Sequence, residues 1–281
     1  MPKHINKTIY FGRLNVICPF TKEEKIEYIF NSLNKQMSEE EKDFMYGFFE
    51  IKRFNHMDKA FVTGLLVKYK IETDEEIVDE SNRVLDKTMI PNKIIAKSEF
   101  ILHLHSGIIA YHPITNHIPN NKFRTEFCKL LEKANNRIFV NAEIQPIDEE
   151  AKIFEAIKKF EIIYSLKIAL HPSNPSNRNR WKKTDDKLRK MEVENYCEIY
   201  RSRHGIKIDE NDEAYGNIIM AADGYGEARI KGTREGKETS ASTTQLQMTL
   251  KVENEPLLSS MELLYKSFHK IFERFEKNDK N

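Results

Sequence analysis

The side chains best suited to chemistry gather in one short basic segment, residues 177–191. Seven lysines and arginines stand there against two aspartates, and the segment also holds Trp181, the only tryptophan of the chain. Clustered cations bind nucleic acids because neutralising phosphates releases condensed counterions, and an exposed tryptophan can stack on an unpaired base. The segment therefore predicts a nucleic-acid surface made of Arg178, Arg180, Trp181, Lys182, Lys183 and Lys187. The alternative is a solvated helix face on which Trp181 anchors the start of a helix in the core.

A glycine-containing hairpin over residues 223–232 is the second candidate. On a strand, Tyr225, Glu227, Arg229 and Lys231 project to one side, so Arg229 and Lys231 extend the predicted basic surface. The glycines do not form a dinucleotide-binding fingerprint, because the third glycine is missing and the segment leads into a strand. An ordinary exposed strand face is the alternative. A single binding site requires the hairpin and the basic segment to lie on the same side of the fold.

Four histidines within fifteen residues are the third candidate: His103, His105, His112 and His117. Imidazoles collected in this way can bind a transition metal. No aspartate or glutamate lies between them, however, and their spacing matches neither a zinc-protease nor a deaminase motif. We therefore expect no metal and no cofactor, and whether the four side chains converge stays open. Nucleophile motifs are also missing, so the catalytic residues are unknown.

The amino-acid composition indicates where the protein is located and shows that any basic site covers only part of the molecule. The 281 residues include 45 lysines and arginines against 44 aspartates and glutamates, so a basic site must be local. The three cysteines, Cys18, Cys128 and Cys197, form neither a disulfide framework nor a zinc pattern, which indicates a reducing compartment. No apolar run reaches the length of a membrane span. We expect a cytoplasmic protein with no membrane partner.

The first half of the chain alternates between strand and helix signals. A β-branched and aromatic run predicts a strand over residues 8–18, and Thr21 with Glu24 has the pattern of a capping box that begins a helix. Residues 72–97 are acidic at first and then have no regular pattern. The other expected elements are hairpins over 44–54/59–71 and 99–105/108–112, a helix from Asn120 or Asn121, and a strand over 137–145.

The second half begins with Asp148 as the expected cap of a helix. A strand with alternating apolar residues follows over 162–170. A C-terminal amphipathic helix is expected over 257–275. Its wide apolar stripe favours docking on the protein's own sheet, and dimerisation through the same stripe is the alternative. The remaining expected elements are a helix from Thr184, a strand over 196–203, a helix over 212–222 and a long hairpin over 225–233/238–252.

Strands outnumber helices and hairpins are frequent, so the expected fold class is α+β. We expect largely antiparallel, hairpin-rich sheets with helices packed on one face and a C-terminal amphipathic helix. Residues 1–147 are predicted to form an N-terminal α+β domain. Residues 148–281 are predicted to form a C-terminal α+β domain with the basic segment and the C-terminal helix. The boundary is soft, and the alternative is one continuous unit.

A set of short motifs runs along most of the chain. In order they are Leu14-Asn15, FVTGLL at 61–66, Ile90-Pro91-Asn92, the strand–turn–strand at 100–111, Asn174-Pro175-Ser176 and GYGEARIKG at 224–232. This set resembles the DUF4747 family of bacterial proteins. The resemblance implies an association with mobile and defence-rich parts of bacterial genomes, and it supplies no catalytic residues. In layout alone, the chain is also similar to the phage-exclusion protein of lambdoid prophages, a DNA-binding dimer.

The leading hypothesis is a bacterial anti-phage defence protein that binds nucleic acid, DNA rather than RNA, through its local basic surface and without catalysis of its own. One alternative is a nuclease-type toxic effector of a defence system. Another is a component that only binds proteins or dimerises. A homodimer and a partner protein encoded nearby both fit the resemblance.

Overall fold

Strand β1 (Lys7–Ile17) organises the larger of two antiparallel sheets. The structure, a computed structural model, describes residues 7–18, 21–56, 59–134, 140–173, 179–252 and 259–278. Every residue of β1 from Phe11 to Val16 is buried, because both faces of the strand are covered. Its partners are β6 (Ile108–Tyr111), β7 (Asn141–Pro146) and β12 (Thr249–Val252).

Hairpins build the rest of this sheet. The strand order is β12-β1-β6-β5-β4-β3-β2, and β7 pairs with β1 beside this path. Both hairpins predicted for the first half are present. The strands not yet defined are β2 (Ser38–Glu41), β3 (Phe44–His56), β4 (Lys59–Asp79) and β5 (Val84–His103).

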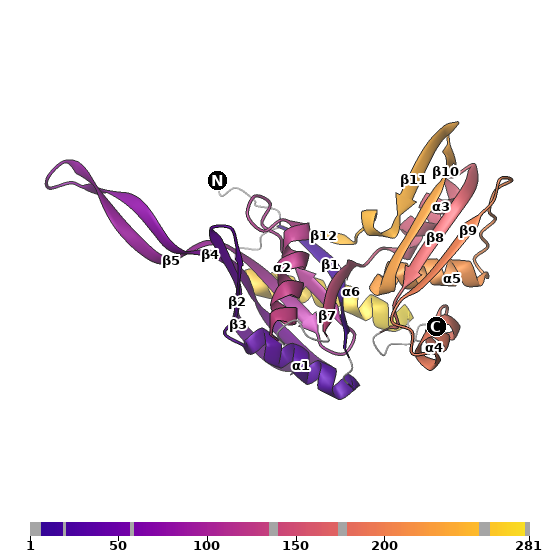
Figure 1. Cartoon of the computed structure of the whole chain (residues 1–281), viewed down its shortest axis with the longest axis horizontal. Helices are drawn as coiled ribbons and strands as arrows, with labels where there is room; N and C mark the ends of the chain where they lie inside the picture. Colours follow the sequence, from indigo (N-terminus) through magenta and orange to yellow (C-terminus); the bar gives the residue numbers. More distant parts are fainter. Residues whose placement is uncertain are drawn as a thin grey trace.

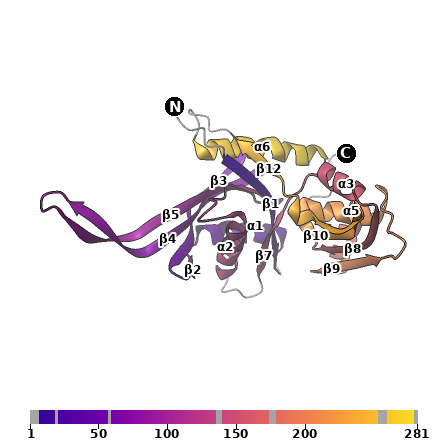
Figure 2. The same ribbon diagram turned by 90° about the horizontal axis from the view of Figure 1, so that it is seen from above.

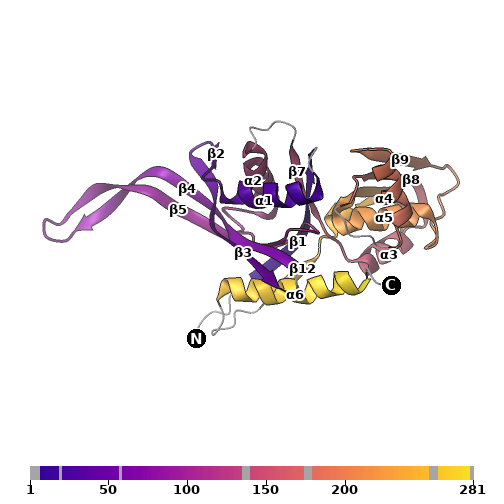
Figure 3. The same cartoon turned by 90° about the horizontal axis from the view of Figure 1, so that it is seen from below.

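Helices cover both faces of the larger sheet (Figures 2 and 3). Helices α1 (Lys22–Asn34) and α2 (Asn120–Lys133) lie on one face, and α6 (Ser260–Asn278) lies on the other. The predicted capping box begins α1, since Thr21 Oγ1 accepts a hydrogen bond from the Glu24 amide and the Glu24 carboxylate accepts one from the Thr21 amide.

Helix α6 docks on its own sheet, as the width of its apolar stripe predicts. Phe268 and Phe272 stand edge-on against the ring of Phe61 in β4, with ring centroids 5.8 and 5.7 Å away. Leu264 and Ile271 are buried in the same cluster. The stripe is therefore occupied within the chain, which removes it as a free surface for dimerisation.

Strands β4 and β5 continue past the sheet as a long two-stranded arm (Figure 1). Their pairing extends to Asp79 and Val84 at the tip. This corrects the expectation that residues 72–97 are irregular. The arm buries no continuous face, so its sequence lacks the apolar alternation from which a half-buried strand is recognised. Pro91 is tolerated because a two-stranded ribbon has only edge strands.

The second sheet has the order β11-β10-β8-β9. In β8, Leu166, Ile168 and Leu170 are buried whereas Lys167 is exposed, so one face packs on the helices and the other faces solvent. Its strands are β8 (Ile162–Leu170), β9 (Tyr196–Arg201), β10 (Gly226–Arg234) and β11 (Lys237–Ser242), and the helices beside it are α3 (Glu150–Lys158), α4 (Lys182–Lys190) and α5 (Glu213–Met220).

The chain crosses between the sheets twice. It leaves the larger sheet between Pro146 and Glu150, where the domain boundary was predicted. It returns after a short 3₁₀ turn at Thr243–Gln245, so that β12 pairs with β1 and α6 packs on the larger sheet. The C-terminal stretch that the sequence groups with the second half therefore lies on the first sheet.

Two expected helix caps are corrected. Helix α3 begins after Glu149, and Asp148 is buried without capping it. Helix α2 begins after Pro119, and the Asn120 side chain instead accepts a hydrogen bond from the Tyr111 hydroxyl. Among the described residues, no helix is long and apolar enough to cross a membrane.

Gly226, at the start of β10, should be intolerant of alanine. Its φ is 152°, and an added Cβ would lie 1.9 Å from the carbonyl oxygen of Ala169 on the neighbouring strand. We expect Gly226→Ala to cost more in unfolding free energy than the roughly 1–3 kcal/mol of backbone strain alone.

Gly236→Ala is the matched control, because φ is 68° there and no atom lies within 4 Å of the added Cβ. It should cost only the roughly 1–2 kcal/mol of the left-handed backbone. Urea unfolding of the two variants measures the difference. Equal midpoints would contradict the close approach of β8 and β10.

Candidate nucleic-acid interface

Trp181 lies in the core and does not reach the surface. Only 2% of the residue is exposed, and its indole Nε1 donates a hydrogen bond to Asp223 Oδ2 at 2.8 Å. The ring stands edge-on to Tyr225, with centroids 5.4 Å apart. The indole is therefore not available to stack on a base, which corrects that part of the predicted surface. The alternative, in which Trp181 anchors the start of a helix, is the arrangement observed.

Helix α4 turns its lysines outward because of the spacing of its other residues. Trp181, Thr184, Asp185 and Leu188 recur at helical spacing and are all buried. Asp185 accepts hydrogen bonds from the backbone and hydroxyl of Ser173 and from Arg189, and Thr184 donates one to Asn217. The opposite side of the helix carries four exposed lysines: Lys182, Lys183, Lys187 and Lys190.

The arginines predicted for this surface are differently placed. Arg180 forms an ion pair with Glu150 of α3 at 3.0 Å, and its guanidinium lies 5.6 Å from the centre of the Tyr215 ring. It therefore joins α3 and α5 on the helical side of the second sheet. Arg178 lies outside the described residues.

Arg229 and Lys231 project from the other face of the second sheet. Strand β10 alternates, so Ala228 and Ile230 are buried against the helices while Arg229 and Lys231 are exposed. Helices α3 and α5 lie on one side of this sheet in Figures 2 and 3. We call the other side, which no described helix covers, the open face.

The pairing of β8 with its two neighbouring strands places two further cations on the open face. Lys167 of β8 is directly opposite Arg229, and Ser165 of β8 is opposite both Lys231 and Arg201 of β9. Four cations from three strands therefore lie on the open face. Lys167 and Arg201 were not among the residues predicted from the sequence. The signal for Lys167 was its place between Leu166 and Ile168 in an alternating strand.

Charge on the open face is only partly compensated. Arg229 pairs with Glu227 at 2.7 Å. Partial burial on its own raises the pKa of Glu227, but hydrogen bonds from Arg229 and Ser242 outweigh it, so the pKa is lowered overall. Lys167, Arg201 and Lys231 form no ion pair with a described side chain. Like charges directly opposite one another destabilise a strand pair, so an anionic ligand would reduce the repulsion between Lys167 and Arg229.

Tyr164 adds an aromatic ring to the open face. It is the extra residue of β8 at a bulge opposite Lys231 and Gly232. Burial and the neighbouring Glu238 carboxylate raise the pKa of its hydroxyl. Glu238 belongs to β11 and pairs with Thr233, which shares the open face with Lys231.

The two predicted halves of the basic surface do not meet. The lysines of α4 lie on the helical side of the second sheet, where Lys187 is 5.8 Å from the centre of the Tyr196 ring. Tyr196 pairs with the buried Leu170, so it faces the helices. Arg229 and Lys231 face the opposite way. The single composite site is thus replaced by two separate basic patches.

The histidines do not form a metal site in the described part of the chain. No group of three or more His, Cys, Asp or Glu side chains converges there. His103 is buried with its Nδ1 2.8 Å from Ser106 Oγ, and burial lowers its pKa to about 3. The rings of His103 and His105 are 5.7 Å apart, whereas His112 is fixed by its backbone to Glu99 and His117 belongs to a turn with Ile114.

A buried polar junction joins the two sheets. The Arg13 guanidinium donates hydrogen bonds to the carbonyl oxygens of Asp223 at 2.5 Å and Ser106 at 2.8 Å. Asp148, 4% exposed, lies beside this junction, and neither of its carboxylate oxygens has a hydrogen-bond partner among the described groups. Residues 221–225 form an irregular turn there, in which Gly224 has a φ of 87°.

One protein-family model matches nearly the whole chain. The model of one family, described as a domain of unknown function (DUF4747), matches residues 7–273. The chain belongs to the DUF4747 family. No curated protein matches it. The match begins with β1 and runs into α6, so the DUF4747 unit includes both sheets and both crossings between them.

Because Trp181 is the only tryptophan of this DUF4747 protein, its fluorescence can test whether the indole is buried. We expect weak quenching by acrylamide, and we expect the quenching constant to stay the same when an oligonucleotide is added. Protein unfolded in urea provides the exposed reference. Protection of the indole by the oligonucleotide would contradict the core position.

Asp148 should make stability depend on pH. Burial raises its pKa from 3.8 to about 8, and the neighbouring Asp223 acts in the same direction. Between these two pH values the carboxyl is ionised in the unfolded chain and protonated in the folded protein, so folding takes up a proton. The contribution of Asp148 to stability is therefore full below about pH 4 and is lost as the pH rises to about 8. Asp148→Asn avoids that loss.

We expect the unfolding midpoint of Asp148→Asn, relative to the unaltered protein, to rise steadily from pH 4 to pH 8. Asp186→Asn is the control, because Asp186 is exposed on α4. A difference that does not change with pH would contradict a carboxyl held neutral at the junction.

Proposed function

We propose that this protein binds nucleic acid through the open face of its second sheet. The observation that carries the proposal is the gathering of Lys167, Arg201, Arg229 and Lys231, from three strands, on the face that no described helix covers. Phosphate neutralisation by such cations supplies binding strength. The protein as a whole carries a net charge of only +1, so this attraction is local.

The form of the face supports an unpaired strand as the ligand. A sheet surface is shallow, and the side chains of alternate residues stand out from it. Tyr164 and the 52%-exposed Ile199 offer stacking and apolar contact for bases, while the cations meet the phosphates. Sheets in other proteins hold single strands by the same combination of aromatic rings and positive charge. We propose DNA rather than RNA as the ligand.

The biological setting of the proposal is bacterial defence against phage. Its support is the resemblance to a family associated with defence-rich genome regions, and membership in that family is shown. In this setting the protein acts in the cytoplasm, where it meets invading nucleic acid. Catalysis is not part of the proposal.

Two matched fourfold variants test which basic patch binds. The first changes Lys167, Arg201, Arg229 and Lys231 to Gln. The second changes the four exposed lysines of α4, Lys182, Lys183, Lys187 and Lys190, to Gln. Each removes four positive charges, so any effect of net charge alone is the same in both.

We expect the open-face variant to bind single-stranded DNA more weakly, because it loses phosphate contacts. The slope of log affinity against log salt should fall by about 3, at roughly 0.7–0.9 per lost phosphate contact. The α4 variant should keep the slope of the unaltered protein. Titration by fluorescence anisotropy at several salt concentrations measures both, with an RNA of the same sequence for comparison.

Equal losses in the two variants, a larger loss in the α4 variant, or no salt-dependent binding at all would each overturn the proposal. The oligonucleotide should also be recovered intact after incubation with Mg²⁺. Degradation that a single carboxylate or histidine substitution abolishes would favour the nuclease alternative instead.

A further inference from the structure

The arm formed by β4 and β5 extends well away from the rest of the molecule (Figures 1 to 3). Beyond Tyr69, β4 continues to Asp79, and at roughly 3.3 Å per residue this is a ribbon about 33 Å long. No other described element lies beside it in any of the three views. A two-stranded ribbon without a third strand or a covering helix is only marginally stable in water.

The arm exposes several large apolar side chains to solvent. Val78 and Leu85 are directly opposite one another and are 69% and 67% exposed. Met89 is on the same face as this pair, two positions beyond Lys87. Ile71 and Ile77, 56% and 46% exposed, lie on the other face. Apolar residues concentrated in this way on an exposed element favour an interaction surface.

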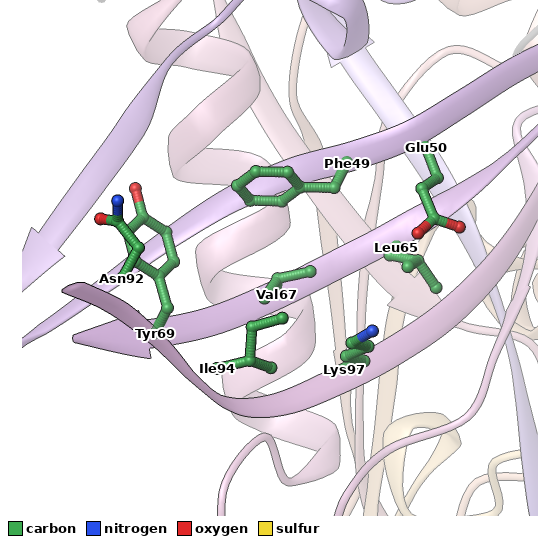
Figure 4. A pocket seen from close by; sticks show the side chains of 8 residues that line it. All are labelled: Phe49, Glu50, Leu65, Val67, Tyr69, Asn92, Ile94 and Lys97. Carbon is green, nitrogen blue, oxygen red and sulfur yellow. The ribbon is translucent and has the colours of Figure 1, made fainter. Parts of the chain in front are cut away.

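An uncovered apolar groove of about 420 Å³ lies at the base of the arm (Figure 4). Phe49, Val67 and Ile94, one each from β3, β4 and β5, line it side by side. Tyr69 closes one end, with its ring 5.9 Å from that of Phe49. Phe61, further back on the same face of β4, is covered by α6. The groove is therefore the part of this sheet face that α6 does not reach.

Charge is distributed unevenly along the arm. The tip, residues 74–88, has six acidic and two basic residues. The base, residues 66–73 and 89–98, has four basic residues and one acidic residue. Lys97 stands at the rim of the groove. Two such arms laid antiparallel bring the acidic tip of each onto the basic base of the other.

We infer that two copies of this chain form a dimer by pairing their arms antiparallel around a twofold axis. The apolar side chains of each tip cover the groove of the other copy, and the acidic residues of each tip face the lysines beside that groove. A twofold axis requires a surface that complements itself, and the opposite charges of tip and base satisfy this requirement. The second copy also supplies the packing that an isolated ribbon lacks. Because α6 is occupied within the chain, the arm is the surface that joins the copies.

A pair of charge-reversed variants tests the arrangement. The tip variant carries Asp74→Lys, Glu76→Lys and Glu80→Lys, at exposed positions whose side chains form no ion pair with a described residue. These changes leave three acidic and five basic residues at the tip, so its net charge becomes positive. The base variant carries Lys70→Glu and Lys97→Glu, which leaves two basic and three acidic residues at the base, so its net charge becomes negative. In either variant alone, tip and base carry like charges, so both contacts of the twofold dimer repel.

We expect the full-length protein to be a dimer by light scattering at concentrations on the order of 1 µM, and each variant to be a monomer there. Mixing the two variants should restore a dimer, because the positive tip of one then meets the negative base of the other and the remaining tip and base keep their natural charges. Circular dichroism of each variant checks that the fold is kept. Dissociation of the natural dimer as salt rises is also expected.

Ile77→Ser with Val84→Ser tests the apolar contribution separately. Both side chains are exposed in one copy, at 46% and 54%, so the change should leave the thermal midpoint of the monomer unaltered and weaken the dimer at least tenfold. A monomeric natural protein, a dimer that persists in both charge-reversed variants, or a mixture that stays monomeric would each overturn the inference.

Discussion

The buried guanidinium of Arg13 is the contact on which the arrangement of the two sheets depends. It lies in β1, donates hydrogen bonds to the backbone of Asp223 and Ser106, and stands 4.3 Å from the centre of the Tyr225 ring. A buried charge is stable only when its hydrogen bonds are made, so the turn at 221–225 must stay against β1. Trp181 holds α4 to the same turn through Asp223. The side on which each basic patch appears therefore follows from this junction.

The molecule separates its two proposed interactions in space. The open face belongs to the second sheet, and the arm leaves the larger sheet on the opposite side of the molecule (Figure 1). A dimer joined by its arms would keep both open faces uncovered. Two linked sites on one strand of DNA bind more tightly than either alone, provided that the strand can reach both.

Much of the fold was predictable because many of its signals are local. The capping box at Thr21 and Glu24, the hairpin around Ser106 and Gly107, and the docking stripe of α6 all depend on residues a few positions apart. The arm was not predictable in this way. Its strands pair with each other over many residues but bury neither face, so no periodicity separates them from an irregular acidic segment. The candidate site was predicted in part: Arg229 and Lys231 are on the open face, whereas Lys167 and Arg201 join them only through strand register.

The sequence by itself determined which residues of each element share a side. Alternation separates Arg229 and Lys231 from Ala228 and Ile230, and helical spacing separates the lysines of α4 from Leu188. Only the tertiary structure decided which side is covered. It buried Trp181 beneath α4, directed the two basic patches to opposite sides of the second sheet and left the arm bare. The physical reason is that periodicity is a property of one element, whereas burial depends on the distant element that packs against it.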